Sequence, residues 1–322
     1  MRIGFAPSGR RDAAAAVSLA RRAEDAGFAE VWVSEDYLER GAFAVAGGIA
    51  AATTRVGVGI GVINPWTRHV ALTAMECAAL DEISGGRLCI GMGASNRAWM
   101  QDRLGIPFER PIAVLVEYVE ALRTLLAGER LRRRVNGQDV DAALAFTPAR
   151  TRPPIVLGVK GRLALERGAA VADGVMLSVL SSPEYVSWVR QTYAPRAVTA
   201  YVMFSRDPDP AAARARIAAR AGLFLGVHGP SPITEVPGLP AAVATAFRDR
   251  LVAGQDATDL VTEPIARMFT VSGTDDECVA GLRRFADAGL DTLVVLDDGT
   301  GDPSATVDDI TEIARKAELL PA

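Results

Sequence analysis

The sequence has few histidines and cysteines, the residues that most often bind metals or form disulfides. Its two histidines, His69 and His228, do not stand in an HxxxH or similar ligand spacing. Its three cysteines, Cys77, Cys89 and Cys278, are far apart and form no CxxC pair. These absences disfavour a metal site and a disulfide framework, and we expect buried free thiols.

The chain also lacks a basic excess and a long apolar segment. The formal net charge is −4 and the sequence pI is about 5.4, so nothing indicates a nucleic-acid partner. No uninterrupted apolar run reaches the ~20 residues that span a bilayer, and Met1 leads directly into the strand-like RIGFAP without the features of a signal peptide. We therefore expect a cytoplasmic protein with neither a membrane nor a nucleic-acid partner.

What the sequence does contain is a regular alternation of short apolar runs and helical patterns. RIGFAP is followed by the helical pattern DAAAAVSLARRAEDAGF and then by AEVWVS, which predicts a strand, a helix and a strand. The same reading gives eight strands, each followed by a helix. They are 2–6, 30–34, 55–63, 87–92, 154–159, 174–179, 197–205 and 291–297.

Eight such units are the number found in a TIM (β/α)8 barrel. We therefore predict an α/β fold of that class, a single domain over residues 1–322, with insertions near 97–110, 129–148 and 226–262. The second insertion contains an Asn-Gly pair typical of a hairpin turn. A doubly wound sheet is the second choice, but no G-x-G-x-x-G joins the first strand to its helix. In a barrel, functional residues lie just after the strands.

The motifs at the strand ends resemble those of the bacterial luciferase-like superfamily. They occur in the order AEDAGFAEVWVSED, GVINPWTRH, LDEISGGRLCIGMGAS, PPIVLGVKG and ADGVMLSVLSSP, and GTDDECVAGLRRFADAGLDTLVV continues the likeness near the end. As a set they are most similar to the deazaflavin-dependent branch typified by methylenetetrahydromethanopterin reductase. The resemblance implies a TIM barrel that binds coenzyme F420 or FMN, transfers a hydride or, with FMN, often activates oxygen, and forms a homodimer.

The run GVGIGVI raises the question of why three glycines interrupt a strand. In relatives of this kind the matching strand runs beneath the flavin ring, and the resemblance implies a non-prolyl cis peptide at Gly61-Val62. Glycine removes the Cβ atom from the face on which an aromatic ring lies. Close packing at a corner of the barrel explains the same glycines equally well.

A second part of the cofactor site is expected at the turn Gly158-Val159-Lys160-Gly161. This turn places backbone N–H groups at a helix start, where the helix dipole favours an anion. Lys160 is one of only two lysines in the chain, and the resemblance places it where the family binds the cofactor phosphate. A solvated surface lysine is the alternative. The other residues expected to contact the cofactor are Asn64, Gly93, Ser178 and Val179.

The acidic pair Glu35-Asp36 stands where many relatives have Asp-His, so the histidine of that pattern is missing here. Either carboxyl group is a candidate proton donor, because a partly desolvated carboxylate near a flavin has a raised pKa. An ion pair with Arg40 or Arg68 is the alternative for these residues. Trp66 and Tyr37 are expected to line the substrate pocket.

These residues predict an oxidoreductase that moves a hydride between F420 and a C=C, C=N or alcohol carbon of a small organic substrate. The alternative within the same fold is an FMN-dependent monooxygenase. The alternative from another class is a non-catalytic flavin-binding protein, which the missing histidine favours and the intact glycine turns oppose. No G-x-S-x-G motif is present, which excludes a serine hydrolase of the α/β-hydrolase type.

Overall fold

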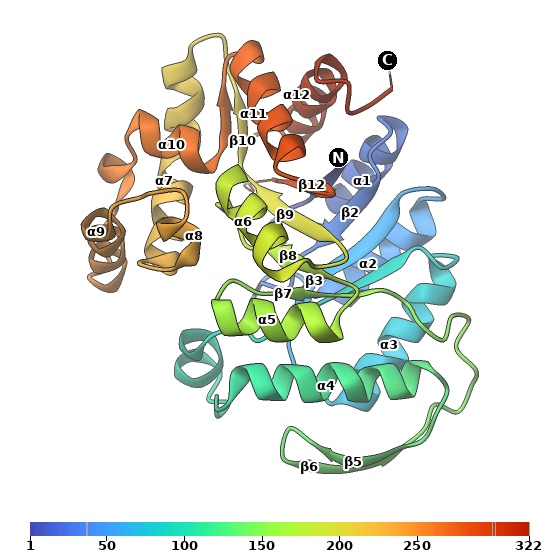
Figure 1. Ribbon diagram of the computed structural model, residues 1–322. Helices are drawn as coiled ribbons and strands as arrows, with labels where there is room; N and C mark the ends of the chain where they lie inside the picture. The colour runs from blue at the N-terminus through green and yellow to red at the C-terminus, as the bar shows by residue number, and fades with distance from the viewer. Residues whose placement is uncertain (37, 298, 300, 322) are drawn as a thin grey trace.

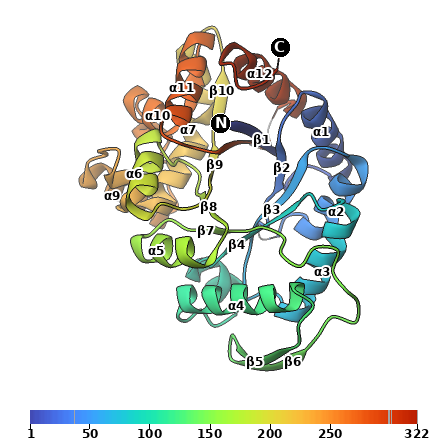
Figure 2. The ribbon, with the colours of Figure 1, turned by 45° about the vertical axis from the view of Figure 1, so that its right-hand side comes forward.

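A closed barrel of parallel strands forms the centre of the molecule. The computed structural model describes residues 1–36, 38–297, 299 and 301–321, and within these the barrel order is β1, β12, β9, β8, β7, β4, β3, β2 (Figure 2). The predicted TIM barrel is confirmed. Its strands are β1 (Arg2–Ala6), β2 (Glu30–Val33), β3 (Gly57–Ile63), β4 (Leu88–Gly93), β7 (Ile155–Gly158), β8 (Gly174–Leu177), β9 (Val198–Val202) and β12 (Thr292–Leu296).

A ring of helices covers the outside of the barrel, as Figures 1 and 2 show. Because parallel strands need a crossover between them, the helices alternate with the strands along the chain. The ring consists of α1 (Ala13–Asp25), α2 (Ala42–Ala52), α3 (Val70–Ile83), α4 (Pro111–Leu126), α5 (Arg162–Val171), α6 (Pro183–Tyr193), α7 (Pro210–His228), α11 (Asp275–Asp287) and α12 (Pro303–Lys316).

The glycines of β3 make room for large side chains inside the barrel. A Cβ atom at Gly59 would collide with the indole of Trp32, and one at Gly61 would lie 2.8 Å from both Trp32 Cε3 and the Tyr201 hydroxyl. Tyr201 also donates a hydrogen bond of 2.7 Å to the carbonyl oxygen of Gly61. Trp32, Tyr201 and Met176 belong to one buried cluster within the barrel. Close packing inside the barrel therefore explains why glycine occupies positions 59 and 61.

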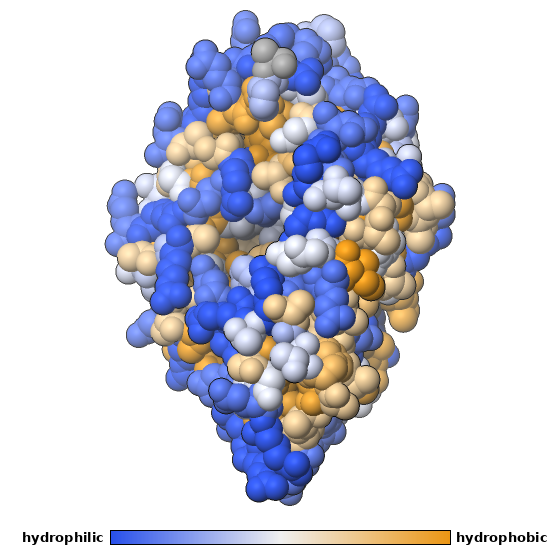
Figure 3. Space-filling view, turned by 90° about the vertical axis from the view of Figure 1, so that its right-hand side faces the viewer, coloured by the Kyte–Doolittle hydropathy of each residue, from blue (hydrophilic) through white to orange (hydrophobic). Residues whose placement is uncertain are grey.

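Additional elements occupy the three segments expected to be insertions. In Figure 1 the hairpin lies below α4, and α8 and α9 lie beside α7. Figure 3 shows that the molecule narrows to a hydrophilic tip at the level of this hairpin. The elements are η1 (Ala98–Arg103), the hairpin strands β5 (Leu131–Val135) and β6 (Gln138–Ala142), α8 (Pro232–Glu235), α9 (Ala241–Val252) and η2 (Thr258–Leu260), with α10 (Glu263–Phe269) following.

The seventh predicted strand, 197–205, is divided in the structure. The barrel strand β9 ends at Val202, and β10 (Phe204–Arg206) pairs in parallel with β11 (Val271–Gly273) outside the barrel. Sequence periodicity does not show that β9 and β10 pair with different strands, because the two strands follow each other without a break in the pattern. The three-residue β11 is too short to show a strand pattern.

Candidate functional site

Three strand ends meet around the side chain of Val62 at the mouth of the barrel. Gly93 ends β4 and Gly158 ends β7, and a Cβ atom at either position would lie 2.6 Å or 2.8 Å from a methyl group of Val62. The peptide bond between Gly61 and Val62 is cis, which confirms that part of the prediction. Val62, Gly93 and Gly158 thus pack together, and we call this group of three residues the valine floor.

The turn that precedes α5 presents a positively charged group beside this floor. Gly161 is the N-cap of α5 and supplies no side-chain hydrogen bond to the first turn of the helix. The Lys160 side chain is exposed to solvent, yet the surrounding protein atoms and the nearby Arg248 lower its pKa. Tyr185 holds the turn by donating a hydrogen bond of 2.9 Å to the carbonyl oxygen of Lys160.

The neighbouring turn between β8 and α6 uses part of its polar groups internally. The Ser181 hydroxyl donates a hydrogen bond of 2.7 Å to the Ser178 carbonyl oxygen, and Ser182 caps α6 by accepting from the N–H of Tyr185. The carbonyl oxygen of Val179 is bonded to a ring nitrogen of His228 at 2.7 Å. Ser178 is half-buried. Unlike Ser181 and Ser182, its hydroxyl group forms no hydrogen bond with the described residues.

The two acidic residues after β2 have different surroundings. Glu35 pairs with Arg68 at 2.6 Å, and its side chain is only 10% exposed, so the ion-pair alternative is the one that the structure shows for this residue. Asp36 is exposed to solvent, but desolvation and the charge of Glu39 raise its pKa against the hydrogen bond from Ser34. The Asp36 charge also contributes, after burial, to a raised pKa of Tyr201.

The segment after β3 folds around Asn64. Its Oδ1 atom accepts hydrogen bonds from the backbone N–H groups of Trp66 (2.8 Å) and Thr67 (3.1 Å), so this predicted cofactor residue organises the loop. Trp66 donates from Nε1 to the carbonyl oxygen of Ala94 at 3.0 Å, and its ring centroid lies 5.2 Å from that of Phe108. Trp66 is therefore held against the first insertion.

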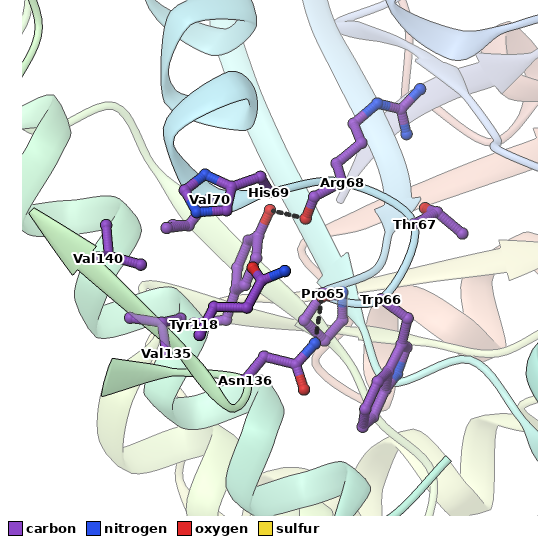
Figure 4. A pocket seen from close by; sticks show the side chains of 11 residues that line it. Pro65, Trp66, Thr67, Arg68, His69, Val70, Tyr118, Val135, Asn136 and Val140 are labelled. Carbon is purple, nitrogen blue, oxygen red and sulfur yellow. Dashed lines mark hydrogen bonds between the residues drawn. The ribbon is translucent and has the colours of Figure 1, made fainter. Parts of the chain in front are cut away.

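A cavity of about 100 Å³ lies on the other side of this loop, between it, α4 and the hairpin (Figure 4). Asn136 at the hairpin turn donates a hydrogen bond of 3.1 Å to the carbonyl oxygen of Pro65. The Tyr118 hydroxyl donates to the carbonyl oxygen of Arg68 at 3.1 Å. His69 accepts from the N–H of Ala71 and so caps α3, which makes it a structural residue. The hairpin and α4 support the loop from outside.

Sequence reasoning missed the residues that reach the site from α7 and α9. The His228 ring contacts the turn that holds Val179, and Arg248 binds the carbonyl oxygen of His228, although both residues follow that turn by many residues. The sequence contains one indirect sign of His228, namely that histidine is rare in the chain. Two isolated histidines form no spacing from which a role can be predicted. Tyr37, predicted to line the substrate pocket, lies outside the described residues.

Two general expectations bear on the kind of site. In the described part of the chain, no group of three or more His, Cys, Asp or Glu residues is arranged to hold a metal ion. None of the helices described combines the length and the apolar character that a membrane span requires. The arrangement at the barrel mouth instead offers the valine floor, a cation at a helix start and a carboxyl group with a raised pKa.

Comparison with known proteins shows the family to which the chain belongs. The sequence model of the luciferase-like monooxygenase family matches residues 2–292. A 5,10-methylenetetrahydromethanopterin reductase from Methanolobus tindarius is 31% identical over 292 residues, which cover 85% of this chain and 87% of the relative. The F420-dependent tetrahydromethanopterin reductase of Methanopyrus kandleri superposes with a TM-score of 0.83 at 24% identity and covers 97% of both chains. An F420-dependent secondary alcohol dehydrogenase superposes with a TM-score of 0.78 at 18% identity, covering 98% of both chains.

The chain therefore belongs to the luciferase-like monooxygenase family. Its relatives carry the names of reductases and dehydrogenases, so the protein is an enzyme of this family.

Proposed function

We propose that this enzyme transfers a hydride between coenzyme F420 and a C=C, C=N or alcohol carbon of a small organic substrate. The observation that carries the proposal is the valine floor, where Gly93 and Gly158 leave room for the apolar side chain of Val62 at the mouth of the barrel. Such a floor suits the flat ring of a deazaflavin, which supplies the hydride-carrying carbon when bound. The relatives that share most of the chain's length include F420-dependent enzymes.

The residues around the floor fit the rest of such a cofactor. Lys160 and the N-terminus of α5 provide positive potential for a phosphate group. Asp36 is the residue suited to hold a proton for the substrate, because its raised pKa keeps the carboxyl group protonated to higher pH than usual. Trp66 shapes the loop beside the floor, where we place the substrate.

Equilibrium binding of F420 and FMN to the purified protein, followed by quenching of tryptophan fluorescence, tests the proposal. We expect F420 to bind clearly more tightly than FMN. In Gly158→Ala the new Cβ atom would displace Val62, and an overpacking cost of about 1–3 kcal/mol predicts F420 binding weakened about tenfold. Gly47→Ala is the matched control, because a Cβ atom at Gly47 of α2 meets no atom within 4 Å.

Each other outcome overturns the proposal in a defined way. Preference for FMN would indicate a flavin monooxygenase that uses oxygen. Tight F420 binding without hydride exchange with any substrate or reductant would indicate a non-catalytic binding protein. Binding of neither cofactor would leave the fold unchanged and remove the function.

A further inference from the structure

A second cavity lies at the amino end of β7, at the opposite end of this strand from the valine floor. Ile155, the first residue of β7, lines the cavity, whereas Gly158, the last residue, belongs to the floor. The cavity has a volume of about 350 Å³, which lies within the range of roughly 300–1,000 Å³ typical of small-molecule sites. Its walls come from the last turn of α4 and the segment that leads into β7. It is therefore separate from the candidate cofactor site.

Three arginines converge on one carboxylate beside this cavity. Asp173, which directly precedes β8, pairs with Arg123 at 2.7 Å. Arg152 lies 3.3 Å and Arg196 3.7 Å from the other carboxylate oxygen. Among the described residues, none of these three arginines forms an ion pair with a different acid. Since one carboxylate balances one positive charge, two positive charges of the cluster have no ion-pair partner of their own.

Asp173 is fixed in this position by the backbone. Its Oδ2 atom accepts a hydrogen bond of 2.9 Å from the N–H of Ile155. Burial opposes the charge, but this N–H group, Arg123 and Arg152 lower the pKa of Asp173 overall. The carboxylate is therefore ionised near neutral pH, and it holds Arg123 and Arg152 together at the wall of the cavity.

The two arginines that line the cavity differ in their exposure to water. The Nη2 atom of Arg123 bonds to Asp173, but its Nε and Nη1 atoms are buried without a hydrogen-bond partner among the described residues. A cation shielded from water attracts an anion more strongly, because the effective dielectric constant around it is lower. The side chain of Arg152 is 64% exposed, so it can turn from Asp173 to a ligand at little cost.

Glu129 is the acidic side chain that opposes an anion in this cavity. It lines the cavity, but it is exposed and forms no ion pair with the described residues. Water and salt therefore screen its charge more than they screen the charge of Arg123. The carbonyl oxygens of Thr124 and Leu125, in the last turn of α4, already accept from the backbone N–H groups of Glu129 and Gly128. Positive charge thus predominates at the cavity.

We propose that this cavity binds a small organic anion. Its carboxylate or phosphate group contacts Arg152 in the field of Arg123, and its apolar part lies against the side chains of Pro153 and Ile155. The planar fork of an arginine suits both kinds of oxyanion. Occupancy of the site does not depend on F420, because the cavity and the valine floor lie at opposite ends of β7.

Titration calorimetry of the full chain with four probes tests this site. The probes are phenyl phosphate, benzoate, inorganic phosphate and the neutral benzyl alcohol. We expect both organic anions to bind about threefold to tenfold more tightly than inorganic phosphate, because they also bury apolar surface, and benzyl alcohol not to bind. If only one of the two organic anions binds, the site is specific for that headgroup, which still supports an organic anion.

Two arginine variants locate the bound anion. Arg152→Gln should weaken binding of the organic anions by about tenfold, as loss of a charged hydrogen bond predicts. Arg152 is chosen because its exposed side chain can be changed without leaving a buried charge unpaired. Arg167→Gln, an exposed change on α5 that removes the same charge, is the matched control and should leave binding unchanged.

Glu129→Gln keeps the test independent of folding. Removal of this repulsive charge should tighten binding of the organic anions by about twofold to fivefold, a gain that a damaged protein would not show. Lys160→Gln separates this cavity from the proposed cofactor site and should leave the same dissociation constants unchanged.

Other results would overturn the proposal. Unchanged binding in Arg152→Gln would exclude the cavity, and weakening by Lys160→Gln instead would place the anion at the cofactor turn. Equal affinity for inorganic phosphate and phenyl phosphate would exclude a site for an organic anion. Absence of binding by all four probes would remove the site, whether or not the protein binds F420.

Discussion

Glu35 and Asp36 are adjacent in the chain but differ in what surrounds them. Glu35 neutralises Arg68, which also lies 3.3 Å from Glu76, so its negative charge already serves the structure. Asp36 has a hydrogen bond from Ser34 and no ion pair among the described residues, and desolvation raises its pKa. Of the two candidates for proton donor, Asp36 is the one whose surroundings favour the protonated form.

Asp36→Asn tests this role. We expect turnover in the direction of substrate reduction to fall by about 10²-fold or more, because an amide has no proton to give at this pH. In the unaltered enzyme the rate should fall as pH rises through the raised pKa of Asp36, and Asp36→Asn should remove that dependence. A pH–rate profile of both proteins measures it, and a profile that keeps its shape in the variant would contradict the role.

The free energy of unfolding provides an independent test of the raised pKa of Asp36. A carboxyl group whose pKa is raised in the folded state stabilises the fold at low pH and loses this contribution as pH rises through the folded value. Asp36→Asn is therefore expected to be more stable than the unaltered protein near neutral pH. Glu35→Gln should instead be less stable, since it breaks the pair with Arg68, while keeping the pH dependence of the rate.

At the scale of elements, the hairpin β5–β6 supports the loop that carries Trp66. Asn136 and Gly137 form its turn with φ angles of +47° and +78°, as the Asn-Gly pair predicted. The hydrogen bond from Asn136 to Pro65 joins the hairpin tip to the segment between β3 and α3 (Figure 4). If the substrate lies beside Trp66, as we propose, the hairpin acts on that side of the site.

Asn136→Gly removes this support while the backbone keeps its conformation, because glycine adopts positive φ freely. We expect a stability loss of about 0.5–1.5 kcal/mol, a raised KM for the substrate and an unchanged dissociation constant for F420. Steady-state kinetics and F420 titration separate these effects. Asp139→Ala, an exposed change on the same hairpin, is the control. An unchanged KM in Asn136→Gly would show that the hairpin does not influence the substrate.

The sequence predicted the barrel strands and the hairpin, whereas it gave no sign of several contacts between side chains distant in the chain. All eight barrel strands and the hairpin follow from apolar periodicity and turn residues, because these patterns are local. The hydrogen bond of Arg248 with the carbonyl oxygen of His228 depends on how α9 packs against α7, which no local pattern records. The role of Asn64 within its own loop was missed for another reason, since an amide that contacts a ligand and one that organises a turn look the same in a sequence.

At the scale of the whole molecule, the barrel closes where its first and last strands meet. β1 pairs with β12 over its full length, from Arg2 with Thr292 to Ala6 with Leu296. Just beyond this pair, Arg11 binds Asp297, whose side chain is only 1% exposed. Burial opposes the charge on Asp297, but Arg11 and the N–H groups of Gly299 and Ser8 lower its pKa overall. This ion pair joins the loops that follow the first and last strands of the barrel.

Arg11→Gln should lower the free energy of unfolding by about 3 kcal/mol, because it leaves a buried carboxylate without its cation. The lowered pKa of Asp297 means that the pair stabilises the fold above the unfolded value of ~3.9 and loses this contribution as pH falls below it. Urea unfolding at several pH values measures both effects. Arg22→Gln, which breaks an exposed pair with Asp308, should cost less than about 1 kcal/mol. An equal loss of unfolding free energy in Arg11→Gln and Arg22→Gln would contradict the role of the Arg11–Asp297 pair in stabilising the closed barrel.

The valine floor also has a consequence for how the family varies. Val62 occupies the space that side chains at positions 93 and 158 would need, so the three residues share one volume across three strands. A homologue with a larger residue at either glycine position must carry a smaller one at position 62. Substitutions at these three sites are therefore expected to be inherited together, and a search for residue pairs that change in concert should detect them as one unit.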